Sequence, residues 1–219
     1  MKIIIFGATG MVGQGVLREC LRDASVESIL AVGRSPSGAK DPRVIECLQP
    51  DLFNFAAYEA QLKGYDACFF CLGVSSFRMS ELAYRRMTYT LTLDIAQAVA
   101  RRSPNLTFVY VSGAGTDSSE KGRSMWARVK GATENALLRL PFKAAYMFRP
   151  GAIVPLNGIR SKTRLYDLAY TLSRPVLGPL QKIFPNAITT TEQVGRAMLK
   201  VAREGAPKAI LESVDINAL

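Results

Sequence analysis

The spacing of three glycines near the N-terminus constrains the fold more than any other feature of the chain. The run "KIIIFG" (2–7) is apolar and β-branched, which is typical of a buried strand, and "GATGMVG" follows it at once. Gly7, Gly10 and Gly13 are spaced G-x-x-G-x-x-G, and an amphipathic helical pattern continues over 14–23. Such glycines permit a tight turn, close approach of the backbone to a pyrophosphate, and close packing of helix on strand. A glycine-rich turn alone is weak evidence, but between a strand and a helix it predicts a dinucleotide-binding loop.

The rest of the chain alternates short apolar runs with longer helical patterns. Several of these runs lack polar alternation, as expected of parallel strands that are buried on both faces. Further strands are expected at 28–33, 43–48, 67–73, 106–113 and 144–151, and helices at 80–101 and 125–139. This order predicts an α/β fold: a Rossmann-like, doubly wound parallel sheet with strand order 3-2-1-4-5-6.

The C-terminal part departs from this alternation. Residues 152–190 are expected to form a small cap on the substrate side, and their apolar, aromatic stretch 161–185 would imply a hydrophobic ligand. A dimer surface or a membrane-interface helix are the alternatives for that stretch. A helix is then expected at 189–204, opened by a capping box at Thr189 or Thr190, and a short strand at 209–214.

Length and composition exclude several classes of protein. With 219 residues, the chain (1–219) is expected to form a single NAD(P)-binding domain. It contains no histidine, which removes Ser-His-Asp hydrolysis, Cys-His nucleophiles and every histidine-containing metal site. Cys68 and Cys71 form a CxxC inside an apolar strand pattern, where an offset of three places them on opposite faces, so we interpret them as core residues.

The net charge and the apolar segments bear on partners and location. The formal charge of +10 favours phosphate-bearing partners such as a nucleotide cofactor, nucleic acid or an anionic membrane. Because the basic residues are scattered and not interleaved with aromatics, nucleic acid is an unlikely partner. The N-terminal apolar run is too short for a signal peptide, and no stretch reaches the roughly 18–20 uncharged apolar residues of a membrane span. We therefore expect no transmembrane segment and a cytoplasmic protein.

The residues after the second expected strand bear on the choice between NAD and NADP. An NAD-preferring loop would place an acid there to bind the ribose 2′-hydroxyl. The sequence has "VGRSP" instead, so Arg34 and Ser35 occupy this turn. A guanidinium can grip a 2′-phosphate with two hydrogen bonds, and Lys40 could reinforce it. A solvated arginine on a surface turn is the alternative, but the pattern favours NADP over NAD.

Several motifs together resemble one superfamily. They are "GATGMVG", "CLGVS" after the fourth strand, "YVSGAG" after the fifth, "WARVKGATE", "FRPG" after the sixth, and "TTTEQVG". The chain resembles an atypical, epimerase-like short-chain dehydrogenase/reductase, and is similar to the nitrogen-metabolite-repression regulators and the Tat-interacting-protein group. The resemblance extends from Met1 to about Met198, and it specifies the superfamily better than the substrate.

The resemblance assigns roles to individual positions. It implies that Ser112 polarises a substrate carbonyl and that Lys130 holds the nicotinamide ribose. The positions implied to bind cofactor are Gly7, Thr9, Gly10, Met11, Val12 and Gly13 at the pyrophosphate, Asp51 and Leu52 at the adenine, Cys71, Leu72 and Gly73 beneath the adenosine ribose, and Pro150, Gly151 and Ile153 at the nicotinamide.

The chain departs from the superfamily at its central position. A tyrosine is expected four residues before Lys130, but Trp126 stands there. A phenol beside an ammonium can hand a proton to a carbonyl oxygen as hydride arrives, whereas an indole N–H only donates hydrogen bonds and does not ionise usefully. Tyr89 is the preferred stand-in as proton donor, and an ordinary packing role is its alternative. The other hydroxyls in reach are those of Ser112, Thr116, Ser124 and Tyr84.

Two hypotheses about function follow. The first is an NADP(H)-dependent oxidoreductase or isomerase of a small apolar carbonyl compound, with Ser112 and Lys130 central. The second is a non-enzymatic NADP(H)-sensing regulator that acts through a protein partner. A small-molecule substrate or a protein partner is thus expected, and a homodimer is possible.

Overall fold

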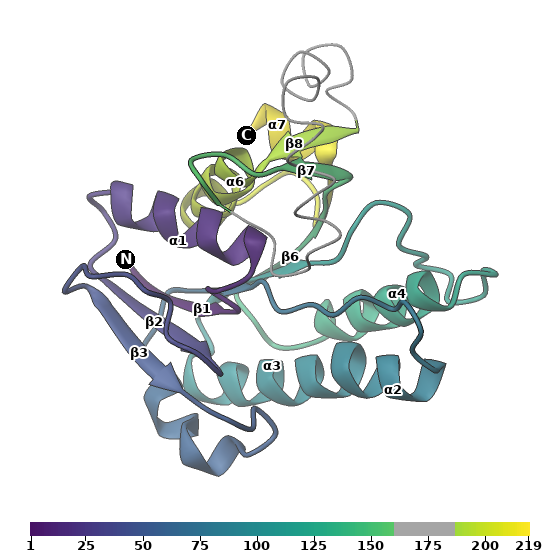
Figure 1. Ribbon diagram of the computed structural model, residues 1–219, viewed down its shortest axis with the longest axis horizontal. Coiled ribbons are helices and arrows are strands. Elements are labelled where there is room, and N and C mark those ends of the chain that lie inside the picture. Colours follow the sequence, from purple (N-terminus) through teal and green to yellow (C-terminus); the bar gives the residue numbers. More distant parts are fainter. Residues whose placement is uncertain (160–186) are drawn as a thin grey trace.

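Seven parallel strands form the main sheet of the computed structural model, which describes residues 1–159 and 187–219 (Figure 1). The strands are β1 (Lys2–Phe6), β2 (Ser28–Gly33), β3 (Val44–Leu48), β4 (Ala67–Phe70), β5 (Thr107–Val111), β6 (Ala144–Arg149) and β9 (Ile210–Glu212). Their spatial order is β3-β2-β1-β4-β5-β6-β9, and every pair is parallel. The predicted fold and order are confirmed, and the expected C-terminal strand extends the sheet beside β6.

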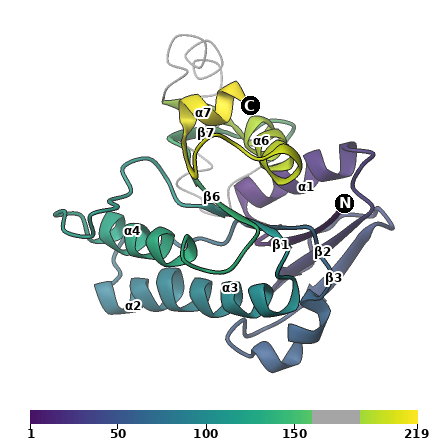
Figure 2. The same cartoon turned by 180° about the vertical axis from the view of Figure 1, so that it is seen from behind.

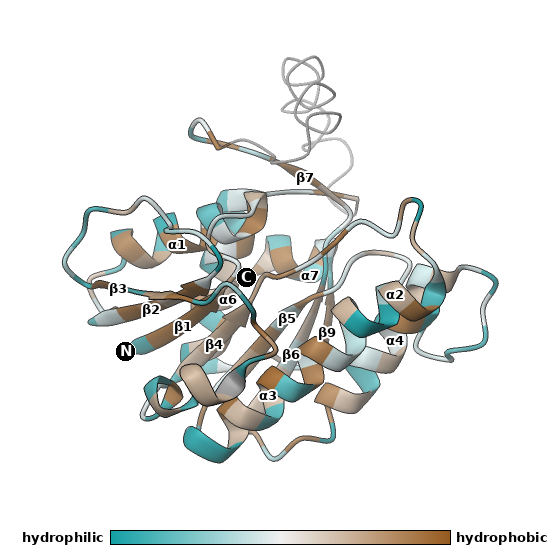
Figure 3. Ribbon diagram, turned by 60° about the horizontal axis from the view of Figure 1, so that its bottom comes forward, coloured by the Kyte–Doolittle hydropathy of each residue, from teal (hydrophilic) through white to brown (hydrophobic). Residues whose placement is uncertain are grey.

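Helices cover both faces of this sheet (Figures 1 and 2). One face carries α1 (Met11–Arg22) and α6 (Thr191–Glu204), and the other carries α3 (Leu91–Arg102) and α4 (Met125–Leu137). Apolar side chains of the strands belong to two core clusters, one on each face of the sheet. Figure 3 shows hydrophobic residues in brown along the central strands. In β1, Ile3 and Ile5 belong to the core on the α1 side. Ile4 and Phe6 belong to the core on the α3 side. This two-sided burial explains the unbroken apolar runs of the sequence.

The long helix expected after β4 is present but interrupted. It comprises α2 (Glu81–Arg85), a π-helical turn η3 (Arg86–Thr90) and α3. The Ser80 hydroxyl caps its start by accepting from the Ala83 N–H at 3.2 Å. The helical pattern of the sequence predicted one continuous helix over 80–101 and did not reveal this turn.

The chain after β6 is less regular. A second, two-stranded parallel sheet pairs β7 (Ala152–Val154) with β8 (Ile188–Thr190), and neither strand was expected. The expected capping box is half formed: the Thr190 hydroxyl accepts from the Gln193 N–H at 3.0 Å, while the Gln193 amide donates to the Ile216 carbonyl. The chain also forms η1 (Phe55–Ala57), η2 (Glu59–Leu62) and α7 (Ser213–Ala218). Most of the expected cap lies at 160–186, outside the described residues.

Two further properties concern membranes and metals. Within residues 1–159 and 187–219, no helix is both long enough and apolar enough to cross a bilayer. Over the same residues, no group of three carboxylate or thiol side chains is placed to hold a metal ion.

Candidate functional site

Two adjoining cavities lie where the strands of the main sheet end. The larger, here called the cleft, has a volume of about 560 Å³. The smaller, here called the adenosine pocket, has a volume of about 270 Å³ and shares Leu72 and Gly73 with the cleft. The cleft is lined by Gly10, Met11, Val12, Cys71, Leu72, Gly73, Val111, Ser112, Gly113, Ala114, Trp126, Lys130, Pro150, Gly151 and Ile153. The adenosine pocket is lined by Arg34, Pro50, Asp51, Leu52, Phe53, Leu72, Gly73, Val74, Met87 and Leu91.

Most of the residues expected to bind the cofactor therefore meet in one continuous hollow. The exceptions are Gly7 and Gly13, which shape the loop from behind, and Thr9 and Ser35. These last two line a separate cavity of only about 10 Å³. A groove of about 520 Å³ also lies between α1 and α6, but its arginines Arg196 and Arg203 are ion-paired with carboxylates of α1 and the residue after it. The hollow at the strand ends is the better candidate site.

The glycine loop has the geometry that its spacing predicts. Gly7 adopts a φ of +82°, and a Cβ there would lie 3.0 Å from the Cys71 carbonyl carbon. A Cβ on Gly13 would lie 2.1 Å from the Gly7 carbonyl oxygen, so only glycine permits this packing of α1. Gly10 is the N-cap of α1 and has no side chain to satisfy the first-turn N–H groups. These N–H groups belong to residues that line the cleft, which fits the pyrophosphate of a dinucleotide.

The turn after β2 carries the expected cation, and the neighbouring strand β3 places an unexpected acid beside it. Arg34 is exposed and faces the adenosine pocket. Glu46, on the neighbouring strand β3, lines the small cavity with Thr9 and Ser35. Its Oε1 accepts from the Ser37 N–H at 2.9 Å, and its buried Oε2 has no hydrogen-bond partner among the described residues. Glu46 was not singled out from the sequence, where its only signal is a charged residue within an apolar strand.

Lys130 and Trp126 form the opposite end of the cleft. They lie one turn apart on α4, and both line the cleft wall. The Lys130 ammonium donates a hydrogen bond to the Ser112 carbonyl oxygen. The cation–π contacts of the described residues involve other pairs, and Trp126 packs instead beside Gly115, whose Cβ would lie 3.5 Å from the indole ring. Lys130 is thus held against the end of β5, and not against the tryptophan.

Burial shifts the pKa values of two side chains in the cleft wall. Desolvation lowers the pKa of Lys130 to about 8, although the negative charge of Glu134 acts in the opposite direction. Burial also raises the pKa of Cys71 to about 12. Lys130 and Cys71 are the only ionisable side chains of the described cleft wall, so Lys130 alone changes its charge near neutral pH.

The Ser112 hydroxyl is hydrogen-bonded in the interior of the fold, and its expected role toward a substrate carbonyl stays a prediction. Its backbone borders the cleft, but its hydroxyl donates to the Glu134 carboxylate and lies 3.1 Å from the Phe148 carbonyl oxygen. Ser112 is buried, and these partners lie in the interior. The neighbouring position faces the site instead, since a Cβ on Gly113 would lie 3.9 Å from the Lys130 Nζ. Position 113, where a Cβ would lie near the ammonium, therefore carries no side chain.

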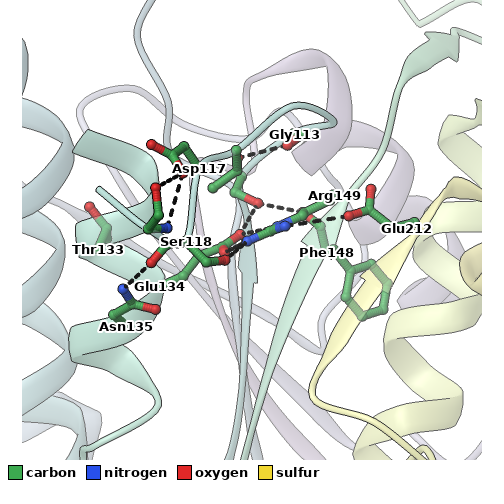
Figure 4. A network of polar contacts seen from close by, with 12 residues as sticks. Gly113, Asp117, Ser118, Thr133, Glu134, Asn135, Phe148, Arg149 and Glu212 are labelled. Carbon is green, nitrogen blue, oxygen red and sulfur yellow. Dashed lines mark hydrogen bonds and ion pairs between the residues drawn. The ribbon is translucent and has the colours of Figure 1, made fainter. Parts of the chain in front are cut away.

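A buried polar network continues from Ser112 (Figure 4). Glu134 is fully buried, and the single Nε–H of Arg149 is shared between its two carboxylate oxygens, each 3.1 Å from Nε, while Nη2 donates to Oε2. Arg149 also donates to the Ser118 hydroxyl, and its Nη1 lies 3.5 Å from a carboxylate oxygen of Glu212. The hydrogen bonds to Glu134 raise the pKa of Arg149. The network ties α4 to the ends of β5, β6 and β9.

The other proposed proton donors lie outside the cleft wall. The Tyr89 ring packs against the Arg85 guanidinium, 4.3 Å from its centroid. Tyr84 is buried, and burial raises the pKa of its phenol. The Thr116 hydroxyl donates to the Gly113 carbonyl at 2.7 Å. Cys68 and Cys71, as expected, pack on opposite sides of the sheet and are free thiols.

Comparison with known proteins defines the class. WbmF of Bordetella bronchiseptica, solved in complex with NAD+, superposes with a TM-score of 0.69 at 14% identity, over 99% of this chain and 76% of that one. UDP-glucuronic acid 4-epimerase of Bacillus cereus, in complex with NAD, gives a TM-score of 0.69 at 11% identity, over 96% and 76%. The protein therefore has the Rossmann-like fold of epimerase-like short-chain dehydrogenases/reductases. Residues 7–139 match the family described as NAD(P)H-binding, and the chain belongs to that family.

The curated relatives are distant and carry a location in their names. Protein fmp52-2, mitochondrial, of Aspergillus oryzae is 24% identical over 98% of this chain and 95% of its own length. Protein FMP52-2, mitochondrial, of Scheffersomyces stipitis is 26% identical over 96% and 90%. Protein FMP52, mitochondrial, of Chaetomium globosum is 24% identical over 69% of this chain, and the match spans 65% of that relative. These names contradict the expectation of a cytoplasmic protein, which rested on the short N-terminal apolar run and on the lack of a membrane-spanning stretch.

Proposed function

We propose that the protein binds NADP(H) in the combined hollow and reduces a small apolar carbonyl compound at the Lys130 end. The observation that carries this proposal is the continuity of the site. The cleft connects the uncapped N-terminus of α1, at Gly10, with the Lys130 ammonium, and it shares its middle with the adenosine pocket beside Arg34. A nicotinamide dinucleotide requires this succession of an adenosine site, an anion site and a polar group near the reacting ring.

The character of the cleft wall supports an apolar substrate. Of the described side chains that line it, Lys130 is the only one that is charged at neutral pH, and most of the others are aliphatic. Trp126 adds a flat apolar surface at the end where a substrate would lie. The choice of NADP over NAD rests on Arg34, because its side chain lines the adenosine pocket and forms no ion pair with the residues that the structure describes. The mitochondrial names of the relatives favour that location for this chain too, which cell fractionation would test.

A specific observation favours a second candidate, an NADP(H)-sensing regulator without turnover. Trp126 stands where a phenol would be expected, and the Ser112 hydroxyl is engaged by Glu134. Both groups that the superfamily uses to polarise a carbonyl are therefore missing from the cleft surface. Binding would survive this loss, since the cofactor features are built from the backbone of α1 and from Arg34.

Titration of the single tryptophan tests cofactor binding. Trp126 lines the cleft, and nicotinamide absorption overlaps indole emission, so NADPH should quench its fluorescence. We expect quenching by NADPH at about 10-fold or more lower concentration than by NADH, as a charged hydrogen-bonded contact is worth about 1.5–3 kcal/mol. Quenching accompanied by oxidation of NADPH with 4-nitrobenzaldehyde or related aldehydes supports the reductase. Quenching without turnover over such a panel supports the regulator, and no quenching, confirmed by calorimetry, contradicts both.

A further inference from the structure

Few side chains of the described cleft wall can transfer a proton, and this narrows the choice of proton donor for a carbonyl reduction. Reduction of a carbonyl leaves an electron pair on oxygen that must take up a proton. The Trp126 indole does not ionise usefully, and the Ser112 hydroxyl is already bonded to a carboxylate. The Cys71 thiol has a pKa of about 12 and is too weak an acid. Of the described cleft wall, this leaves the Lys130 ammonium.

The placement of Lys130 suits a donor. An ammonium has three N–H bonds, and one of them is directed to the Ser112 carbonyl. That contact anchors Nζ at the end of β5, while the side chain still borders the cleft. The adjacent residue is Gly113, so no side chain from this position separates Nζ from a substrate oxygen. The remaining N–H bonds are available for a ribose hydroxyl and a carbonyl oxygen.

We propose that Lys130 is the general acid of the reaction, in addition to any role in holding the cofactor; this inference rests on the proposed reductase function. When bound, NADPH supplies a hydride, with its two electrons, to the carbonyl carbon. As the C=O π bond breaks, the oxygen takes a proton from Lys130, so that an O–H bond forms and an N–H bond breaks. The neutral amine left behind then regains a proton from water.

The Glu134–Arg149 pair acts as the positioning element for this donor. Glu134 lies one helical turn beyond Lys130, and its charge partly offsets the desolvation that lowers the lysine pKa. Arg149 faces the same carboxylate from β6 and neutralises it, so that Glu134 does not hold the lysine as a tight ion pair. Glu134 also accepts from Ser112, the residue whose carbonyl anchors Nζ. Among the described residues, Glu134 is thus the charge that acts on Lys130, with Arg149 as the ion-pair partner of Glu134 and Cys71 as the other ionisable side chain of the cleft wall.

The pH dependence follows from these groups. The reduction needs the ammonium form, so its rate is expected to be level below about pH 8 and to fall above it as Lys130 loses its proton. Oxidation of the corresponding alcohol with NADP+ needs the neutral amine and should rise through the same pH. Carbon-13 NMR of the reductively methylated protein measures the titration of Lys130 directly, without turnover, and its assignment comes from the signal missing in Lys130→Arg.

Lys130→Arg separates proton donation from cofactor binding. Arginine keeps a positive charge and hydrogen-bond donors, but it does not deprotonate at any pH in question. We expect NADPH affinity to stay within about 3-fold, and the rate to fall by about 10²–10⁴-fold with no break near pH 8. Trp126→Tyr in the Lys130→Arg background should restore turnover by supplying a phenol. Lys143→Arg, an exposed lysine in the loop before β6, serves as the matched control.

The outcomes distinguish the two proposals. Wild-type turnover that persists in Lys130→Arg with an unchanged pH profile overturns Lys130 as the donor, while the reductase proposal stands. A Lys130 signal that titrates above pH 10 also overturns it. NADPH binding without any wild-type turnover overturns the reductase, and the role of Lys130 falls with it. Titration near pH 8 together with loss of turnover in Lys130→Arg supports both.

Discussion

The two ends of the site differ in how they are built. The cofactor end relies on backbone: glycine turns, the first N–H groups of α1, and one arginine at the edge of a pocket. The Lys130 end relies on side chains that must be of the right kind and must point the right way. Here Trp126 stands four residues before Lys130, where the resemblance led us to expect a phenol, and the Ser112 hydroxyl donates to the buried Glu134 carboxylate. Binding features made of backbone survive the exchange of side chains, whereas proton-transfer features do not.

The largest expected effect is on the buried pair at the Lys130 end. Arg149→Met would leave the fully buried Glu134 carboxylate without its ion-pair partner and should lower the free energy of unfolding by about 3–5 kcal/mol. Urea denaturation measures this as a lower midpoint at constant slope.

A double variant is the control for this pair. Glu134→Leu with Arg149→Met removes both charges and should recover most of the lost stability, since apolar replacement of a buried ion pair is often neutral. A single Arg149→Met as stable as the wild type would show that the pair does not hold this end together.

The next largest effect is expected in the glycine loop. A Cβ on Gly13 would collide with the Gly7 carbonyl oxygen at 2.1 Å, so Gly13→Ala must displace α1. We expect a loss of about 1–3 kcal/mol in stability and weaker NADPH binding. Gly33→Ala is the control, because its Cβ would meet only a carbonyl oxygen at 3.7 Å and should be tolerated. Equal stability and equal NADPH binding of the two variants would contradict the view that backbone packing at the glycine loop builds the cofactor end.

Arg34→Ala tests the cofactor end through the binding affinities for NADPH and NADH. We expect NADPH binding to weaken by about 10–100-fold, and NADH binding to change by less than about 3-fold, because only NADPH carries the 2′-phosphate. Quenching of Trp126 measures both. Lys63→Ala, a remote exposed lysine, should alter neither. Equal weakening of both cofactors would place the Arg34 contact elsewhere than on the 2′-phosphate.

The smallest effect is expected for Tyr89→Phe. The Tyr89 ring packs on Arg85 and does not line the cleft. Loss of its hydroxyl should therefore leave the turnover rate nearly unchanged and alter the free energy of unfolding by no more than about 0.5 kcal/mol. Steady-state rates with NADPH and chemical denaturation check this. A loss of 100-fold or more in rate would return Tyr89 to the role of proton donor that the sequence suggested.

The geometry of the glycine loop could be read from the sequence more directly than that of the Lys130 end. Gly7, Gly10 and Gly13 lie within seven residues of one another in the chain, so their spacing alone encodes the turn. Glu46, by contrast, reaches Thr9 and Ser35 only through the pairing of β3 with β2. The orientation of the Ser112 hydroxyl depends on Glu134, which is 22 residues away in the sequence. Sequence spacing contains no information about which acceptor such a hydroxyl finds.

The sequence by itself determined the fold class, the strand order and the phosphate loop, because hydrophobic periodicity and glycine spacing are local properties that each segment carries alone. Only the tertiary structure decided that Glu134 and Arg149 form a buried pair, that Ser112 serves this pair, and that Lys130 is the cleft-wall group able to change charge near neutral pH. These outcomes depend on desolvation and on contacts between distant segments. Both arise only when the sheet brings the ends of β5 and β6 against α4.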